Sequence, residues 1–122
     1  GNKAGCATLH TLSLSWCHRV EDVSALAGCA FLHSLDLSIT SVSNISALAG
    51  CAALHTLNLS ECQGVTDVSA LAGCADLHTL HLSNCSVLKD ISALGGCAAL
   101  HTLRLAGTGV MDVSVLAGCT TL

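Results

Sequence analysis

Leu54-His55-Thr56-Leu57-Asn58-Leu59-Ser60-Glu61-Cys62 is the stretch that decides the fold, and it follows the pattern L-x-x-L-x-L-x-x-C. Close copies of this stretch begin at Leu9, Leu32, Leu77 and Leu100. A Gly-Cys pair stands before each copy, and successive pairs lie 22 or 23 residues apart. The glycines of these pairs are Gly5, Gly28, Gly50, Gly73, Gly96 and Gly118. A period of this length indicates a solenoid, in which each unit buries its apolar face by stacking on its neighbours.

Within each unit the periodicity changes from that of a strand to that of a turn. Residues 11–15, Thr-Leu-Ser-Leu-Ser, alternate polar and apolar side chains, which predicts a half-buried strand. Further on, Asp22-Val23-Ser24 precedes Ala-Leu-Ala-Gly. We expect Ser24 to cap a short helical turn and Gly28 to end it in a left-handed conformation. The fold class is therefore an α/β solenoid, with a parallel β-sheet on its concave face and short helical turns or loops on its convex face.

The length of each unit depends on whether the residue after the strand is Cys or Thr. Units with Cys at this position, such as Cys62 and Cys85, are 23 residues long. Units with Thr, namely Thr40 and Thr108, are 22 residues long. The extra residue lies in the turn, and we interpret the Thr hydroxyl as a group that bonds the turn backbone and makes a tighter closure possible.

The composition limits the classes of partner. The hydrophobic fraction is 52% and the charged fraction 10%, which predicts a packed core, and the aromatic residues are only Trp16 and Phe31. The net charge is −4 with histidine neutral, and the four Lys and Arg residues lie far apart. No clustered basic surface for nucleic acid or anionic membrane is present, and no apolar run reaches the roughly 20 residues of a membrane helix.

The nine cysteines follow the repeat and do not form an isolated framework. Equivalent positions in stacked units form ladders, and a free cysteine packs as a small apolar side chain. We therefore expect all nine to be reduced core thiols of an intracellular, cytoplasmic protein, with no signal peptide visible.

The repeat pattern resembles the leucine-rich repeat family. Residues 32–51, with leucines at 32, 35 and 37, Thr40, Val42, Ile45, Leu48 and Cys51, are similar to the short repeats of bacterial internalins and phosphatase-regulatory proteins. The cysteine after the strand is similar to that of F-box-type proteins, and Asp67-Val-Ser-Ala-Leu-Ala-Gly-Cys74 resembles leucine-rich repeat proteins of trypanosomatids. The resemblance covers essentially the whole chain and implies the fold much more than a function.

The expected organisation is a single leucine-rich repeat domain over residues 1–122. It contains five repeats, starting near Leu9, Leu32, Leu54, Leu77 and Leu100, and the start of a sixth. Neither end carries the polar cap that solenoids normally have. We expect the array to be a fragment of a longer one, and end-to-end self-association through the uncapped ends is the alternative.

Two outward rows of residues vary while the rest of the unit is copied. We name the row in the strand the middle row: it consists of Ser13, Asp36, Asn58, His81 and Arg104. We name the row just after the strand the flanking row: it consists of Trp16, Ile39, Glu61, Asn84 and Gly107. A copied framework with varied outward positions is typical of a recognition surface, and neutral drift is the competing interpretation. All of these residues except Gly107 are the predicted partner-binding residues. Trp16 is the candidate anchor or, alternatively, a shield for the first repeat.

A histidine begins every strand, and the histidine row consists of His10, His33, His55, His78 and His101. Zinc shared between adjacent imidazoles is the alternative, but no carboxylate or thiol accompanies them in the row. We favour a structural ladder with the rings edge to edge, which should lose stability below about pH 6.

Catalysis is not expected, because Ser, His and Asp are distributed by the repeat and no nucleophile, phosphate-loop or metalloprotease motif occurs. The sequence thus predicts a non-catalytic protein-interaction module without cofactor or metal, which binds a protein partner on the concave β-face. The alternatives are a structural spacer or self-assembling segment, and a substrate-receptor segment of a ubiquitin ligase.

Overall fold

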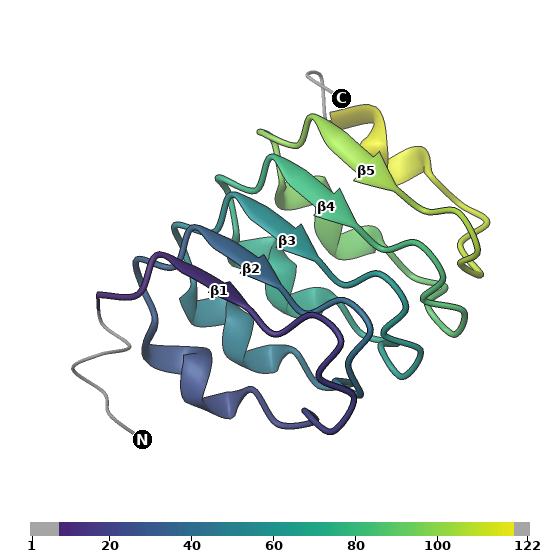
Figure 1. Cartoon of the computed structure of the whole chain (residues 1–122). Coiled ribbons are helices and arrows are strands. Elements are labelled where there is room, and N and C mark those ends of the chain that lie inside the picture. The colour runs from purple at the N-terminus through teal and green to yellow at the C-terminus, as the bar shows by residue number, and fades with distance from the viewer. Residues whose placement is uncertain (1–7, 119–122) are drawn as a thin grey trace.

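The computed structural model describes residues 8–118 and shows a stack of five similar units, which runs from β1 at the lower left to β5 at the upper right in Figure 1. Each unit contributes one three-residue strand and one five-residue 3₁₀ helix. The strands are β1 (Thr11–Ser13), β2 (Ser34–Asp36), β3 (Thr56–Asn58), β4 (Thr79–His81) and β5 (Thr102–Arg104). The 3₁₀ helices are η1 (Ser24–Gly28), η2 (Ser46–Gly50), η3 (Ser69–Gly73), η4 (Ser92–Gly96) and η5 (Ser114–Gly118). The start of a sixth repeat lies outside the described residues.

The five strands form one parallel sheet in chain order, β1-β2-β3-β4-β5. The register pairs equivalent residues, so that Leu35 lies beside Leu57 and Asp36 beside Asn58. The hydrogen-bond ladder continues beyond the strands, because the Leu37 N–H donates to the Asn58 carbonyl at 2.9 Å. The predicted solenoid with a parallel sheet is confirmed.

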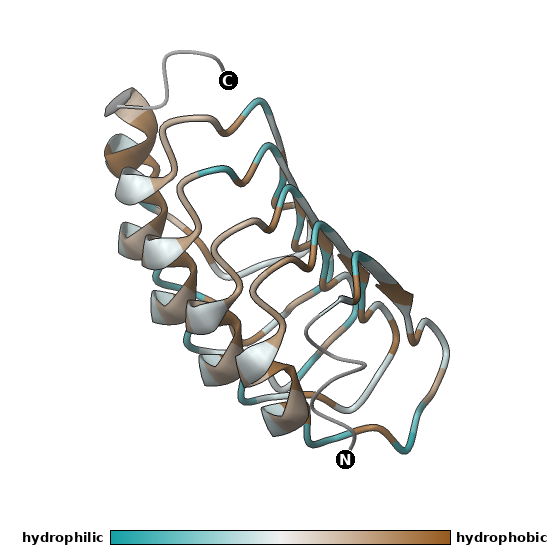
Figure 2. Ribbon diagram, turned by 90° about the vertical axis from the view of Figure 1, so that its left-hand side faces the viewer, coloured by the Kyte–Doolittle hydropathy of each residue, from teal (hydrophilic) through white to brown (hydrophobic). Residues whose placement is uncertain are grey.

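The core lies between the sheet and the 3₁₀ helices, which stack along the opposite side of the solenoid (Figure 2). The leucines of the L-x-x-L-x-L pattern are fully buried in the interior units, as Leu54, Leu57 and Leu59 show with exposures of 0%. Residues from the 3₁₀ side, such as Ile45 and Leu48, complete this core. Because each unit covers the next, burial of apolar surface stabilises the stack and not any single unit.

The predicted serine cap of the helical turn is wrong. The residue before each 3₁₀ helix makes no side-chain cap bond, and Ser24 is the first residue of η1. Instead Asp22 Oδ1 accepts the Ser24 N–H at 2.9 Å, and Asn44 does the same for Ser46. An acidic or amide side chain two residues earlier reaches the free N–H group in an Asx-type turn. Hydrogen bonds from the N–H and the hydroxyl of Ser24 lower the pKa of Asp22, and those from the hydroxyl and the N–H of Ser69 lower the pKa of Asp67.

The predicted left-handed glycine at the end of the helical turn is also wrong. Among the described residues, the only glycine with positive φ is Gly107, which lies after β5. At Gly50 an added Cβ would lie 2.5 Å from the carbonyl oxygen of Ala27, and at Gly96 it would lie 3.1 Å from that of Ala72. Glycine is needed here because successive 3₁₀ helices pack closely, and not because of its backbone conformation.

The interpretation of the turn after the strand is confirmed. The Thr40 hydroxyl donates to the Leu37 carbonyl at 2.7 Å and accepts the Val42 N–H at 3.5 Å. In the longer unit the Cys62 carbonyl takes over and accepts the N–H of Val65 at 3.1 Å. The side-chain oxygen of threonine thus closes the turn one residue earlier than a backbone carbonyl does.

Five of the described cysteines are reduced core thiols as predicted, and the other two depart from that prediction. Cys51, Cys62, Cys74, Cys85 and Cys97 are free and buried, and the thiol of Cys62 donates to Leu37 O at 3.0 Å. Burial raises the pKa of the Cys74 thiol to about 11, so this thiol remains neutral. Cys29, however, is disulfide-bonded, so the prediction that all nine thiols are reduced is wrong. Cys17 is free but exposed, so its predicted place in the core is wrong. Cys6 and Cys119 lie outside the described residues.

Candidate functional site

The middle row forms a continuous line across the sheet. The strand register places Asp36 between Ser13 and Asn58, and His81 between Asn58 and Arg104. Neighbouring positions on adjacent strands lie about 4.8 Å apart, so a partner that crosses the sheet meets all five side chains in sequence. Ser13 and Arg104 are exposed and the three between them are half-buried. The structure thus brings together every predicted residue of this row.

Two residues of the middle row are also bonded to their own units. Asp36 Oδ1 accepts the Ser38 N–H at 2.9 Å and the Ser38 hydroxyl at 2.6 Å. Asn58 Oδ1 accepts the Ser60 N–H at 2.9 Å. Their side chains therefore hold the end of the strand as well as facing outward. The Asx-Leu-Ser spacing was the signal, because Asp and Asn commonly bond the backbone two residues ahead.

The flanking row has an unusual backbone conformation that the sequence did not reveal. Trp16, Ile39, Glu61 and Asn84 have φ between 57° and 71°, and Gly107 has a φ of 76°. In this left-handed region a Cβ is crowded by the following carbonyl oxygen, which costs roughly 1–2 kcal/mol per residue. Gly tolerates the conformation and Asn often adopts it, whereas a β-branched residue such as Ile39 is a genuine outlier.

The ladder of backbone hydrogen bonds holds the flanking row in this conformation. The Trp16 N–H donates to Ser38 O at 3.0 Å, and the Asn84 N–H donates to Ala106 O at 2.7 Å. Each residue therefore follows the edge of the sheet while its side chain turns away from the core. Trp16 is the most exposed aromatic side chain of the described residues, at 68%. Its ring centroid lies 6.1 Å from that of His18.

The histidine row borders the same face. The rings of His33, His55, His78 and His101 stack face to face, with centroids 4.7–4.9 Å apart and interplanar angles of 5–8°. The predicted ladder is therefore present, but the edge-to-edge arrangement is wrong, because the parallel register superimposes the rings. Nδ1 of His55 lies 3.1 Å from the hydroxyl of Thr56, the first residue of β3. Within residues 8–118 no group of three or more His, Cys, Asp or Glu side chains could hold a metal ion.

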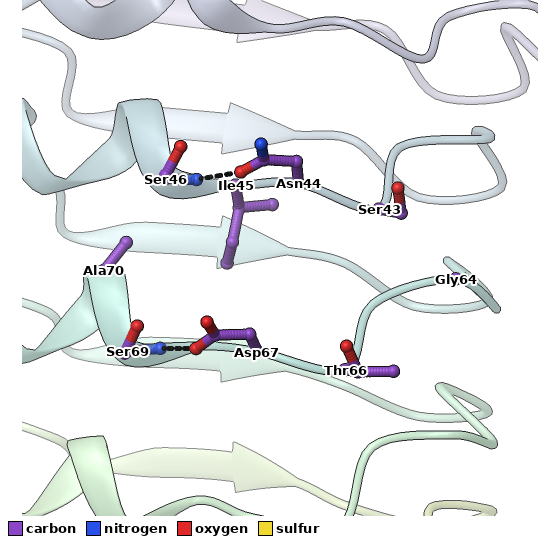
Figure 3. Close-up of a pocket in the computed structure, with 9 residues that line it drawn as sticks. All are labelled: Ser43, Asn44, Ile45, Ser46, Gly64, Thr66, Asp67, Ser69 and Ala70. Carbon is purple, nitrogen blue, oxygen red and sulfur yellow. Dashed lines mark hydrogen bonds between the residues drawn. The ribbon is translucent and has the colours of Figure 1, made fainter.

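A shallow depression lies elsewhere, on the segments that lead from the strand-end turns into η2 and η3 (Figure 3). Ser43 and Thr66 line one side, and Asn44 and Asp67 accept the N–H groups of Ser46 and Ser69 along its floor. These oxygens are occupied by turn bonds, so the depression offers no converging set of catalytic groups. Among residues 8–118, no helix has the length and apolar character that crossing a membrane requires.

Comparison with known proteins identifies the repeat. A family model of leucine-rich repeats in two copies matches residues 52–96, and a single leucine-rich repeat model matches residues 5–27. No curated protein matches the sequence. The structure is similar to the crystal structure of internalin C2 from Listeria monocytogenes, with a TM-score of 0.87 and 32% sequence identity. That comparison covers 100% of this chain and 54% of the internalin, so the chain spans about half the length of its relative.

A more distant protein shares the fold alone. A leucine-rich repeat protein of Leptospira interrogans has a TM-score of 0.85 at 16% identity, over 98% of this chain and 31% of that protein. A second internalin from Listeria monocytogenes has a TM-score of 0.54 at 18% identity, over 100% of this chain and 49% of the internalin. These comparisons confirm the expected internalin-like repeat.

Proposed function

We propose that this chain, which belongs to the leucine-rich repeat family, binds a protein partner across the middle and flanking rows of its sheet. Leucine-rich repeat proteins generally mediate protein–protein interactions and are typically non-catalytic. The partner would lie along the sheet and contact one or two side chains from each unit. No cofactor and no reaction is part of this function.

The observation that carries the proposal is the composition of the flanking row. Its left-handed backbone favours Gly or Asn, and the last two units have Asn84 and Gly107 there. The first three units instead hold Trp16, Ile39 and Glu61, each in a conformation that costs stability. Residues retained at such positions are typical of functional sites. An apolar ring, a branched aliphatic chain and a carboxylate in succession supply three different recognition chemistries.

The surroundings of the flanking row support a binding role. The hydroxyl-bearing residues Thr56, Thr79 and Thr102 lie in register across the sheet, two positions before the middle row. They provide a polar, uncharged surface on which the varied side chains stand. Exposed tryptophan is enriched among the residues that dominate binding energy, so Trp16 is the expected anchor.

A photo-activated cross-linking residue tests the proposal directly. It replaces Glu61, which is exposed in the flanking row, or Thr66, which is exposed in the depression away from the sheet. The full chain is then incubated with an extract of the source organism. The expected result is one protein that cross-links at position 61 and does not cross-link at position 66. The cross-link at position 61 should disappear when the chain also carries Trp16→Ala. Equal capture at both positions would contradict the proposal.

Self-assembly is the second candidate and is separated by a simpler measurement. Met111 and Val113 are large apolar side chains that are exposed in the last described unit, at 96% and 53%. Light scattering during size-exclusion chromatography measures the mass as the concentration is raised. A constant monomer mass supports the interaction module, whereas growth with concentration that Met111→Ser abolishes would favour assembly through this unit.

A further inference from the structure

The histidine row is the most regular side-chain array on the surface of the protein. Four imidazoles, from His33 to His101, stack at 4.7–4.9 Å with nearly parallel planes. One ring comes from each of four consecutive units. Every interior ring therefore contacts one unit on each side, and the row joins units that have no other aromatic side chain in common.

Backbone and side-chain bonds meet at the same row. The His33 carbonyl accepts two N–H groups from the next unit, those of His55 at 2.8 Å and Thr56 at 3.1 Å. The His55 carbonyl likewise accepts the N–H groups of His78 and Thr79. Nδ1 of His78 lies 3.0 Å from the Thr79 hydroxyl, which fixes the plane of the ring. A change in the spacing of the rings therefore also strains the bonds that join the sheet edge.

The charges around the row oppose protonation at its centre. Partial burial, His33 and His78 lower the pKa of His55 from its ordinary value of 6.5, and Asp76 acts in the opposite direction. Asp76 belongs to the segment just before His78, and the other titratable groups that act on His55 are the two neighbouring rings. A single carboxylate cannot offset charges that develop on every ring of the row.

We propose that the stacked imidazoles of His33, His55, His78 and His101 form a proton-sensing edge of the sheet, which takes up protons at alternate rings first and loosens the contact between units when adjacent rings are both protonated. Two positive charges on neighbouring rings repel each other across less than 5 Å, so a charge on one ring opposes a charge on the next. After the first protonation step, the row carries charges on alternate rings, and no two protonated rings are adjacent. The second step creates those pairs.

The direction of the effect on stability follows from His55. The folded state favours the neutral ring more than the unfolded state does, so its contribution is fully present above about pH 6.5. The contribution is lost as the pH falls below that value. The window lies where histidine normally titrates, so mild acid is sufficient to change this edge.

Nuclear magnetic resonance titration of the imidazole protons in the full chain tests the alternation. The expected curve of His55 is broad, has two steps and is shifted to lower pH than that of an unfolded reference. In the double variant His33→Gln/His78→Gln, the curve should become a single step at higher pH. His81→Gln is the matched control, because His81 is the last residue of β4, which directly follows His78, but its ring lies outside the stack. A single-step, unshifted His55 curve in the unmodified chain would overturn the proposal.

Amide hydrogen exchange in the unmodified chain tests the loosening without any variant. The His55 and His78 N–H groups, which bond to the histidine carbonyls, are compared with the Leu59 N–H, which bonds to His81 O at the other end of the strand. After correction for intrinsic rates, protection between pH 7.5 and 5.5 should fall on the order of tenfold more at the histidine edge. Equal changes at both ends of β3 would show that the edge does not respond to protons.

Discussion

The unit that contains β2 is one residue shorter than the unit that contains β3, and this difference in length affects both the turn after the strand and the end of the unit. In the shorter unit the Thr40 hydroxyl closes the turn, whereas in the longer unit the Cys62 carbonyl does so. At the end of the shorter unit, a Cβ added to Gly50 would lie 2.5 Å from the carbonyl oxygen of Ala27 in the preceding 3₁₀ helix. At the end of the longer unit, a Cβ added to Gly73 would lie 3.6 Å from the carbonyl oxygen of Ala49. A repeat can therefore change length without changing register, provided that a side chain replaces a backbone acceptor.

The largest expected effect is at the close approach of the 3₁₀ helices. Gly50→Ala places a methyl group against the Ala27 carbonyl, and we expect it to lower the free energy of unfolding by up to about 3 kcal/mol. Gly73→Ala, in the longer unit, should cost less than about 1 kcal/mol. Gly28→Ala is the control, since an added Cβ there meets nothing within 4 Å. Urea unfolding of the three variants measures the difference, and similar losses at Gly50 and Gly73 would break the comparison.

The next effect concerns the turn. Thr40→Val keeps the shape of the side chain but removes the hydroxyl that bonds Leu37 O and the Val42 N–H, which should cost about 1–2 kcal/mol. Thr66→Val, at an exposed position, is the control and should be nearly neutral. The replacement of Thr40 by Cys should also destabilise the chain. One residue inserted before Val42 should restore most of that loss, and no recovery would mean that unit length does not depend on this closure.

The longer unit that contains β4 should be sensitive to alkali because its turn contains the buried thiol of Cys85. Burial raises the pKa of Cys85 from 9.0 to about 11, so the folded state keeps the thiol neutral while the unfolded chain ionises. Its contribution to stability is present below about pH 9 and is lost as the pH rises toward 11. We expect about 1 kcal/mol less stability at pH 10 from this group, and a smaller loss in Cys85→Ala. Equal slopes of unfolding free energy against pH in both proteins would exclude this cause.

The smallest expected effect on stability comes from the flanking row, whose residues have a left-handed backbone in both the shorter and the longer units. Ile39→Asn relieves a branched side chain at a φ of 57° and should raise stability by about 0.5–1 kcal/mol. Asn84→Ile reverses the change in a longer unit and should lower stability by a similar amount. Thermal unfolding detects both shifts. If Ile39→Asn is destabilising, the row is held by packing and not retained at a cost for binding.

Much of the architecture was predictable because stacking makes every unit subject to the same constraints. The parallel register, the buried leucine pattern, the helical turn and the Thr40 closure all follow from positions that recur at a fixed period. The alignment of the middle row across the strands was predictable for the same reason. The histidine ladder was predictable as a row, but not as a face-to-face stack.

The errors concern features that depend on more than one unit or on backbone geometry. Ser24 is a good helix cap in general, but Asp22 lies at the spacing that reaches its N–H first. The closeness of Gly50 to Ala27 exists only after two units have packed. The disulfide of Cys29 likewise could not be distinguished from a reduced ladder by residue type, since all equivalent positions are cysteine.

The sequence by itself determined the period, the strand positions, the aliphatic core and the identity of the varied rows, because alternation and repetition are properties of residue order. Only the tertiary structure decided that Trp16, Ile39 and Glu61 adopt a left-handed backbone. It also decided that the imidazoles stack as a row. Both features arise from the hydrogen bonds between neighbouring units, which set the path of the chain at the two edges of the sheet whatever side chain is present.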